Sequence, residues 1–283
     1  GGPIAKMQEL LDRGGLNWAY SELFQNYDRG AIHHYLPQAL TQSMRDGLQV
    51  NFAETHDNLR LAAQRQSWSR LRTSLCALTS PQGAWGITCG VEWYAAEKID
   101  VHGCSSMNWG AANNLVSQIA SLNQLLLSHP SFHEGSEVKF VMRDADQSLA
   151  LRRVSADGKS AVLVLVNLQA KAVSHVEWSA VDTGTVGPLL WSSHAAGPRS
   201  PTRTADTCKL SLEPGEALCF ELAHTPATSV SHAIKDSPPR EPGQQQRWRW
   251  PQDTRRVFPW MPDHALALEI AGRFRYELEH EGH

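Results

Sequence analysis

Residues 51–60 read NFAETHDNLR and follow the apolar run LQV at 48–50. The pattern predicts a strand over residues 48–53 that ends in a polar cluster running from Glu54 to Arg60. In a barrel of alternating strands and helices, the carboxyl ends of the strands supply the active site. A His-Asp pair at such a place is a weak signal by itself, because these residues more often cap a helix or form a surface turn. Its meaning therefore depends on the elements around it.

Helical and strand-like patterns alternate on both sides of this segment. The sequence predicts helices over 3–13, 29–45, 67–79 and 112–128 and strands over 16–24, 48–53 and 84–89. Such alternation is typical of βα units with a parallel sheet, so this part of the chain is predicted to be α/β. A complete (β/α)8 TIM barrel has eight strands and typically about 250 residues. Only three units fit here, so residues 1–133 are predicted to form a partial barrel.

The pattern becomes all-β from about residue 134. LALRRV at 149–154 and AVLVLVNL at 161–168 flank an Asp-Gly turn, which is a strong hairpin signal. Further strand candidates lie at 175–181, 209–212 and 217–222. We therefore expect an antiparallel β-sandwich over residues 134–224.

Two further regions are predicted beyond this β-domain. Residues 225–256 are rich in Pro, Ser, Gln and Arg and are predicted to be a linker. Residues 257–283 contain the alternating segment ALALEIAGRFRYELE and are predicted to be the start of a further, truncated β-domain.

The composition excludes several classes of protein. The chain has 283 residues, 41% of them hydrophobic, and a net charge of −3, so nothing indicates binding to nucleic acid or to an anionic membrane. No apolar run reaches the roughly 20 residues that span a bilayer. The five cysteines include no C-x-x-C pair, and the 13 histidines no H-E-x-x-H motif. These features favour reduced thiols, a cytoplasmic location, and neither a metal site nor another cofactor.

Two motifs in order resemble a known family. Phe-x-x-x-His-Asp-Asn-x-Arg at 52–60 resembles the end of the seventh barrel strand in the α-amylase family, glycoside hydrolase family 13. GAWGITCGVE at 83–92 is similar to the eighth-strand pattern Gly-x-Pro-x-Ile-Tyr-Tyr-Gly-x-Glu, from which Gly86, Thr88 and Cys89 depart. The helix at 112–128 looks like the last barrel helix. The resemblance spans roughly residues 1–224 and implies the last three βα units of the barrel followed by the family's C-terminal β-domain.

The resemblance also implies roles for individual residues. Asp57 matches the third catalytic carboxylate, which stabilises the transition state, and His56 matches the histidine that hydrogen-bonds sugar hydroxyls. Arg60 falls where a residue of the subsite wall lies, and Glu92 ends the second motif. His56, Arg60 and Glu92 are therefore predicted to bind substrate.

The other two catalytic carboxylates of the family have no counterpart in a matching motif. The Gly-Phe-Arg-x-Asp pattern of the nucleophile does not occur in the sequence. The general acid belongs to the strand before the first helix, where the given sequence begins. Glu22 and Asp28, or Glu92 and Asp100, could stand in for them, although no motif marks them and the first two fit a structural role better. We therefore expect the chain alone to be inactive.

Several functions stay open at this stage. The resemblance implies an α-glucan-active glycosidase that hydrolyses α-glucosidic bonds with retention. NWAYSELFQNYDR at 17–29 and AEKIDVHG at 96–103 look like a cytosolic branch of bacterial enzymes of glycogen metabolism, which favours a transglycosylase or maltosyltransferase as the alternative. The third interpretation is that the chain is a non-catalytic carbohydrate-binding remnant. The expected partners are an α-glucan and the rest of a parent chain.

Overall fold

The computed structural model describes residues 4–45, 47–100, 102–103, 105–145, 147–194 and 199–223, except for the side chains of residues 144 and 145. All of these residues lie within one compact unit of the chain. The predicted linker at 225–256 and the predicted further β-domain at 257–283 lie outside the described residues. No helix in the described part is long and apolar enough to cross a membrane.

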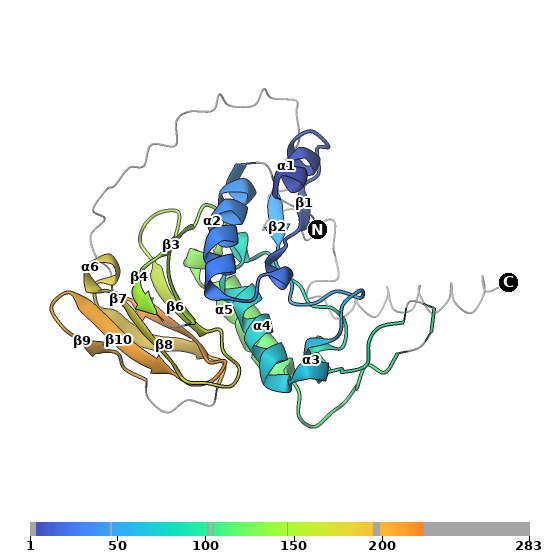
Figure 1. Ribbon diagram of the computed structural model, residues 1–283. Helices are drawn as coiled ribbons and strands as arrows, with labels where there is room; N and C mark the ends of the chain where they lie inside the picture. The colour runs from blue at the N-terminus through green and yellow to red at the C-terminus, as the bar shows by residue number, and fades with distance from the viewer. Residues whose placement is uncertain are drawn as a thin grey trace, which may run out of the picture. The chain divides into compact units, whose positions relative to one another are not determined.

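The first 133 residues hold most of the helices (Figure 1). The α-helices are α1 (Ile4–Asp12), α2 (Arg29–Arg45), α3 (Leu61–Gln64), α4 (Gln66–Leu78) and α5 (Val116–Ser128). Short 3-10 turns are η1 (Leu23–Gln25), η2 (Pro81–Gly83), η3 (Val91–Trp93) and η4 (Pro130–Phe132). The helices predicted at 3–13, 29–45, 67–79 and 112–128 are therefore confirmed, with the last one beginning four residues later.

Two short parallel strands lie between these helices. Strand β1 (Trp18–Tyr20) pairs in parallel with β2 (Leu48–Val50). The strand predicted over 84–89 is wrong, because among its residues only Trp85 forms a parallel bridge, with Asn51. Two hydrogen bonds hold this bridge, from the Asn51 amide to the Ala84 carbonyl (3.0 Å) and from the Gly86 amide to the Asn51 carbonyl (2.8 Å). Beyond it the chain turns away and enters η3 through Gly90, whose φ of 93° is left-handed.

Residues 137–222 form two antiparallel sheets. One has the order β3-β5-β6-β11-β8 and the other the order β4-β7-β10-β9. The strands are β3 (Glu137–Phe140), β4 (Met142–Ala145), β5 (Ser148–Val154), β6 (Ala161–Asn167), β7 (Ser174–Ser179), β8 (Val186–Ser192), β9 (Thr202–Arg203), β10 (Thr207–Leu212) and β11 (Ala217–Leu222), with the short helix α6 (Ala180–Thr183) after β7. The hairpin predicted around Asp157-Gly158 is confirmed, since β5 and β6 pair along their full length.

Strand β6 is buried on both faces, which explains its continuous apolar sequence. Leu163 and Leu165 point into a cluster shared by the two sheets, where Trp178 of β7 and Leu212 of β10 also lie. The alternate residues of β6 point the other way, as the period of two along a strand requires. Val164 and its neighbours on that side pack against the helical region.

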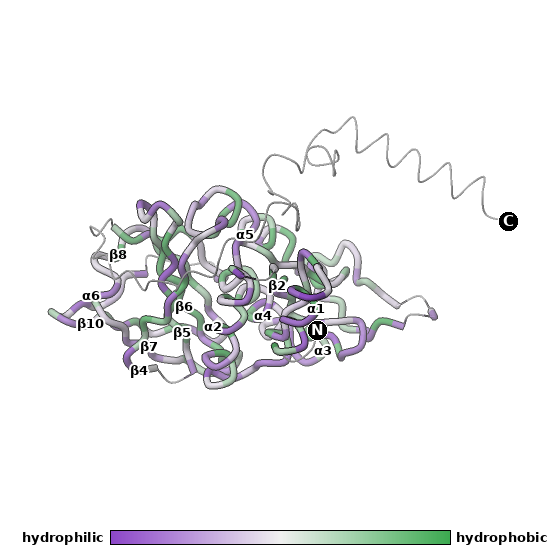
Figure 2. The backbone as a smooth tube through the Cα atoms, turned by 90° about the horizontal axis from the view of Figure 1, so that it is seen from above, coloured by the Kyte–Doolittle hydropathy of each residue, from purple (hydrophilic) through white to green (hydrophobic). Residues whose placement is uncertain are grey.

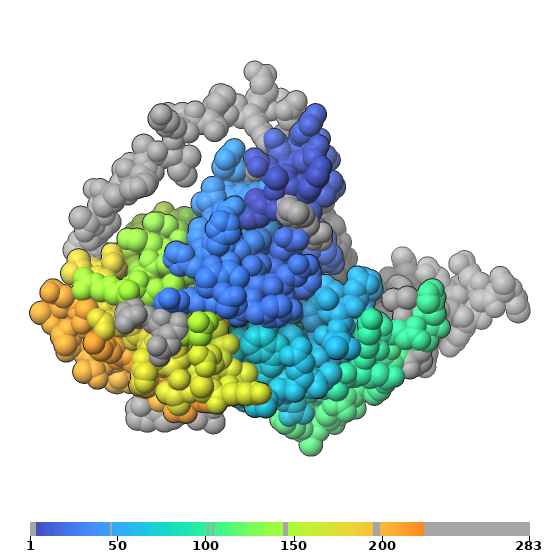
Figure 3. All heavy atoms as spheres, viewed as in Figure 1, coloured from blue at the N-terminus to red at the C-terminus, as the bar shows by residue number. Residues whose placement is uncertain are grey.

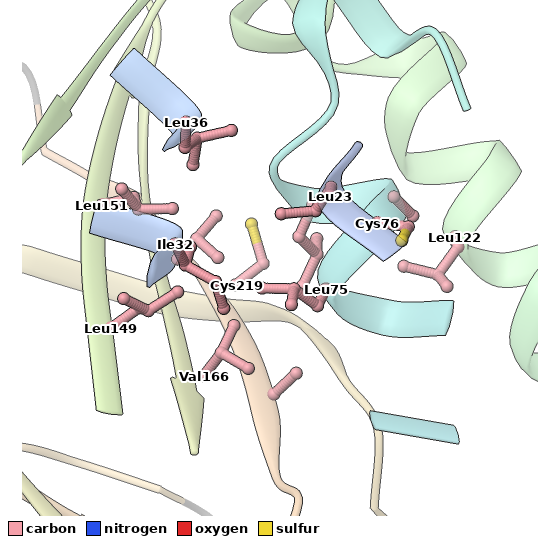
Figure 4. Close-up of a cluster of buried hydrophobic side chains, with 14 of the residues drawn as sticks. Leu23, Ile32, Leu36, Leu75, Cys76, Leu122, Leu149, Leu151, Val166 and Cys219 are labelled. Carbon is pink, nitrogen blue, oxygen red and sulfur yellow. The ribbon is translucent and has the colours of Figure 1, made fainter. Parts of the chain in front are cut away.

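A second hydrophobic cluster joins the helices to the five-stranded sheet. Figure 4 shows Ile32 and Leu36 of α2 and Leu75 of α4 gathered with Leu149 of β5 and Cys219 of β11. Seen from two directions, α1–α5 lie on one side of this contact and β3–β11 on the other (Figures 1 and 2). The two parts of the chain therefore share one core.

Arg153 on β5 is the polar link across this contact. Its side chain is fully buried and donates to three carbonyl oxygens, those of Leu78 (3.1 Å), Ser80 (3.0 Å) and Ser131 (3.0 Å). Its guanidinium also lies over the Phe132 ring, 4.4 Å from the centroid. Burial lowers the pKa of Arg153 to about 10. The carbonyl ends of α4 and η4 are thus satisfied by a strand of the neighbouring sheet.

Candidate functional site

The segment after β2 is anchored by the buried side chain of Asn51. This amide accepts a hydrogen bond from the Ser21 hydroxyl (2.7 Å) and donates to the Cys76 carbonyl (3.2 Å). It therefore ties the end of β2 to the loop after β1 and to α4. The Thr88 hydroxyl adds a bond of 2.7 Å to the Glu54 carbonyl. These hydrogen bonds of Asn51 and of the Glu54 carbonyl fix the start of the polar cluster.

Buried Glu54 and Arg60 form the base of this turn. Glu54 Oε1 lies 2.5 Å from Arg60 Nε, with the two side chains 2% and 1% exposed. Glu54 Oε2 also accepts a hydrogen bond of 2.7 Å from the Leu61 amide, at the start of α3. Burial raises the pKa of Glu54, while the Leu61 amide and the Arg60 charge oppose part of that rise. The pair spans the five intervening residues 55–59 through a charged contact that water does not reach.

His56 and Asp57 stand at the exposed tip of the same turn. Their side chains are 60% and 81% exposed, and His56 Nε2 lies 3.4 Å from Asp57 Oδ1. The Thr55 hydroxyl accepts a hydrogen bond from the Asp57 amide (3.2 Å) and donates to the Asn58 side chain (2.6 Å). The two residues are thus brought together and presented to solvent on a hydrogen-bonded turn.

Arg60 does not lie where a wall of an open subsite requires it. Its side chain is 1% exposed and points inward, to Glu54 and to the Cys89 carbonyl (Nη2 to O, 2.9 Å). Any effect of Arg60 on a bound sugar must therefore pass through the turn that it supports. The resemblance had predicted Arg60 to bind substrate because it falls where a residue of the subsite wall lies in the family.

Glu92 lies beside this support in the second motif. One of its carboxylate oxygens accepts a hydrogen bond from the Gly90 amide (2.9 Å), and its carbonyl accepts one from the Leu115 amide (2.8 Å). Arg60 donates to the Cys89 carbonyl, so the motif at 52–60 is in direct contact with the motif at 83–92. The Glu92 side chain is partly buried and has one oxygen engaged within its own turn.

The comparisons with known proteins agree on one fold. No protein-family model matches the chain. It is 25% identical over 179 residues to an α-1,4-glucan:maltose-1-phosphate maltosyltransferase of Rhodospirillum rubrum, a match that covers 59% of this chain and 26% of that protein. Its structure is similar to α-amylase from H. orenii (TM-score 0.59, 13% identity, 78% of this chain and 52% of that one) and to an Anoxybacillus α-amylase (TM-score 0.59, 15% identity, 76% and 49%).

The chain has an α-amylase-type fold. The resemblance drawn from the motifs at 52–60 and 83–92 is thereby confirmed. The chain spans about a quarter of the length of the curated relative and about half of these solved structures.

One feature of this turn was missed from the sequence. Glu54 was included only as one member of a polar cluster, and nothing in its spacing from Arg60 distinguishes a buried pair from two surface residues. Asp28 caps α2 by accepting a hydrogen bond from the Ala31 amide (2.8 Å), so its predicted structural role is confirmed. In the described residues, no three His, Cys, Asp or Glu side chains are placed to hold a metal ion.

Gly90 is a point at which the site can be tested without substituting a charged residue. A Cβ at this position would lie 2.8 Å from Ala95 Cβ and 3.0 Å from Arg60 Nη2, and its φ of 93° disfavours any side chain. We expect Gly90→Ala to lower the free energy of unfolding by about 2 kcal/mol or more. Thermal unfolding followed by circular dichroism measures this.

Gly86 supplies the matched control for that substitution. It lies in the same segment, and a Cβ there would meet nothing within 4 Å. Gly86→Ala should therefore unfold near the wild-type temperature. If Gly86→Ala lowered the free energy of unfolding as much as Gly90→Ala does, the packing of Gly90 against Arg60 would not be what stabilises this segment.

Proposed function

We propose that this chain forms part of an α-glucan-active enzyme of the α-amylase type, with His56 and Asp57 contacting the sugar at the reacting bond. The observation that carries the proposal is the presentation of these two exposed side chains on a turn held by the buried Glu54–Arg60 pair. The match to the maltosyltransferase and the fold shared with α-amylases support it. Loops after barrel strands are also where active sites of such folds lie.

The chemistry of the turn suits a glycosyl transition state. When an α-glucosidic bond breaks, positive charge develops at the anomeric carbon and its ring oxygen. The carboxylate of Asp57 stabilises that charge, and the imidazole of His56 donates a hydrogen bond to a sugar hydroxyl. The nucleophile and the general acid are proposed to come from the rest of a parent chain, as the resemblance implies. Within this chain, the proposed role of Asp57 and His56 is to bind and orient the sugar.

Transfer is favoured over hydrolysis by one observation. The curated relative is a maltosyltransferase whose name specifies maltose 1-phosphate and an α-1,4-glucan. We therefore propose transfer of a maltosyl group from a sugar phosphate to a glucan as the reaction of the parent enzyme. Retaining hydrolysis of starch-like glucans is the second candidate, since the shared fold is also that of α-amylases. A role in glucan binding without catalysis is the third.

Substitution of Asp57 tests the site. Isothermal titration calorimetry of the full chain with maltoheptaose should show binding, and Asp57→Asn should weaken it about tenfold, because a charge-assisted hydrogen bond is lost. Asp206→Asn is the matched control, since Asp206 is also exposed but lies between β9 and β10. Affinity equal to wild type in Asp57→Asn would remove Asp57 from the proposed site. Absence of any binding by wild type would overturn the proposed function.

Two activity assays separate the candidate reactions. Phosphate release from maltose 1-phosphate in the presence of glycogen reports transfer, and reducing sugar released from soluble starch reports hydrolysis. We expect neither from this chain alone. Either activity, if Asp57→Asn abolished it, would show that the nucleophile and the acid lie within these residues and would select the reaction directly.

A further inference from the structure

Two tryptophans form an exposed aromatic pair outside the groups used so far. Trp109 is 76% exposed, more than any other aromatic residue among the exposed large hydrophobic side chains of the described part. Its ring centroid lies 5.4 Å from that of Trp93, at an interplanar angle of 37°. Trp93 is partly exposed at the end of η3. A tryptophan so open to water leaves a large apolar face without a partner, which marks a candidate interaction surface.

The backbone holds Trp109 in this exposed position. The residues on either side have left-handed backbone conformations, Asn108 with φ of 52° and Gly110 with φ of 77°. The Asn108 side chain donates to the Trp93 carbonyl (2.7 Å), and the Ala111 amide donates to the Asn108 carbonyl (3.2 Å). The hydrogen bond from Asn108 to the Trp93 carbonyl therefore links the backbone segments that carry the two rings. A positioned ring loses less conformational freedom on binding than a mobile one.

The pair lies on a segment that contacts the turn of the proposed glucan site. Trp93 belongs to the same short segment as Gly90, against which Arg60 packs. At the far end of the loop, the Asn113 side chain donates to Gln66 at the start of α4 (2.7 Å). In the space-filling view, the segment after β2, in light blue, and the loop that follows η3, in blue-green, lie side by side on one face (Figure 3).

We propose that Trp109 and Trp93 form a stacking platform for further glucose units of the α-glucan held at His56 and Asp57. One face of a glucose ring carries only C–H groups, which pack on the face of an indole while the hydroxyls at the ring edge stay hydrated. A polymeric substrate extends past the reacting bond, so a platform beside the site binds units that the chemistry does not use. This inference rests on the proposed function and adds a second part to its binding surface.

The test compares two glucans of different length in the full chain. Trp109→Ala should weaken maltoheptaose binding about tenfold in isothermal titration calorimetry, the loss expected for an aromatic anchor, and should change maltose binding little. Trp109→Phe keeps an aromatic face and should retain most of the affinity. Trp18→Ala is the matched control, since Trp18 is 51% exposed at the start of β1.

The outcomes separate this inference from the proposed function. Unchanged maltoheptaose affinity in Trp109→Ala, with a loss in Asp57→Asn, would overturn the platform and leave the function standing. Equal losses for maltose and maltoheptaose would also overturn it, since the platform acts only on the longer chain. No binding of either sugar by wild type would overturn both. A loss confined to maltoheptaose and restored by phenylalanine establishes the platform.

Discussion

The Arg153→Ala variant is expected to unfold about 10 °C below the wild-type chain. Arg153 is fully buried and donates to the carbonyl oxygens of Leu78, Ser80 and Ser131. Alanine removes all three donors and leaves a cavity over the Phe132 ring. The measurement is thermal unfolding by differential scanning calorimetry at pH 7.

The size of this effect follows from what remains after the substitution. Each buried carbonyl left without a donor costs about 1 kcal/mol or more, so three of them cost about 3 kcal/mol. In a domain of this size, 1 kcal/mol corresponds to roughly 2–4 °C in melting temperature. Because the carbonyls belong to the ends of α4 and η4, the loss falls on the contact between the helices and the five-stranded sheet.

Two further variants isolate the cause of the Arg153 effect. Arg153→Lys keeps the positive charge but cannot reach three divergent carbonyls with one ammonium group, so it should unfold between alanine and wild type. Arg143→Ala removes an exposed arginine from β4 and should have little effect. If Arg153→Ala had the same melting temperature as Arg143→Ala, the buried hydrogen bonds of Arg153 would not be what joins the helices to the five-stranded sheet.

Hydrophobic periodicity was enough to predict the helices and the β5–β6 hairpin. The four long helices and the paired strands of 148–167 repeat apolar residues at the spacing that burial of one helix face or both strand faces requires. The strand at 84–89 failed because one bridge at Trp85 and a left-handed Gly90 replace the expected ladder. Local composition does not show where a neighbouring strand stops pairing.

The charged residues were harder to place than the apolar ones. The adjacent Arg152 and Arg153 occupy one strand, and alternation shows only that they face opposite sides, not which side is the core. In NFAETHDNLR, the motif singled out His56 and Asp57, yet it gave no reason to bury Glu54 with Arg60. Their pairing depends on closure of the five-residue loop 55–59 and on the Cys89 carbonyl from another segment.

The second large effect is expected at that buried pair. Arg60→Met keeps much of the volume but leaves the Glu54 carboxylate buried without its cation, which typically costs about 3–5 kcal/mol. The turn that carries His56 and Asp57 loses its support at the same time. We therefore expect a lower melting temperature for the variant. At temperatures where it is still folded, we expect weaker maltoheptaose binding, although the Arg60 side chain is only 1% exposed.

The double variant Glu54→Gln with Arg60→Met shows whether the unpaired charge causes the loss. Glutamine keeps an acceptor for the Leu61 amide, so the double variant should be more stable than Arg60→Met alone. If the double variant were less stable by the sum of the two single losses, the pair would act as two independent contacts. The expected result is strong coupling, because neither partner is exposed to water.

The pH dependence of the Arg60→Met deficit gives an independent check of its cause. Burial already raises the pKa of Glu54, and removal of the Arg60 charge removes one of the influences that lower it. A carboxyl whose folded-state pKa lies above its unfolded value takes up a proton on folding, so the stability of the variant rises as the pH falls. The deficit relative to wild type should therefore shrink between pH 7 and pH 5, whereas the double variant, with no carboxylate at position 54, should show no such change. A deficit of Arg60→Met that stayed constant with pH would mean that lost packing, rather than a buried unpaired charge, weakens the turn beneath Asp57.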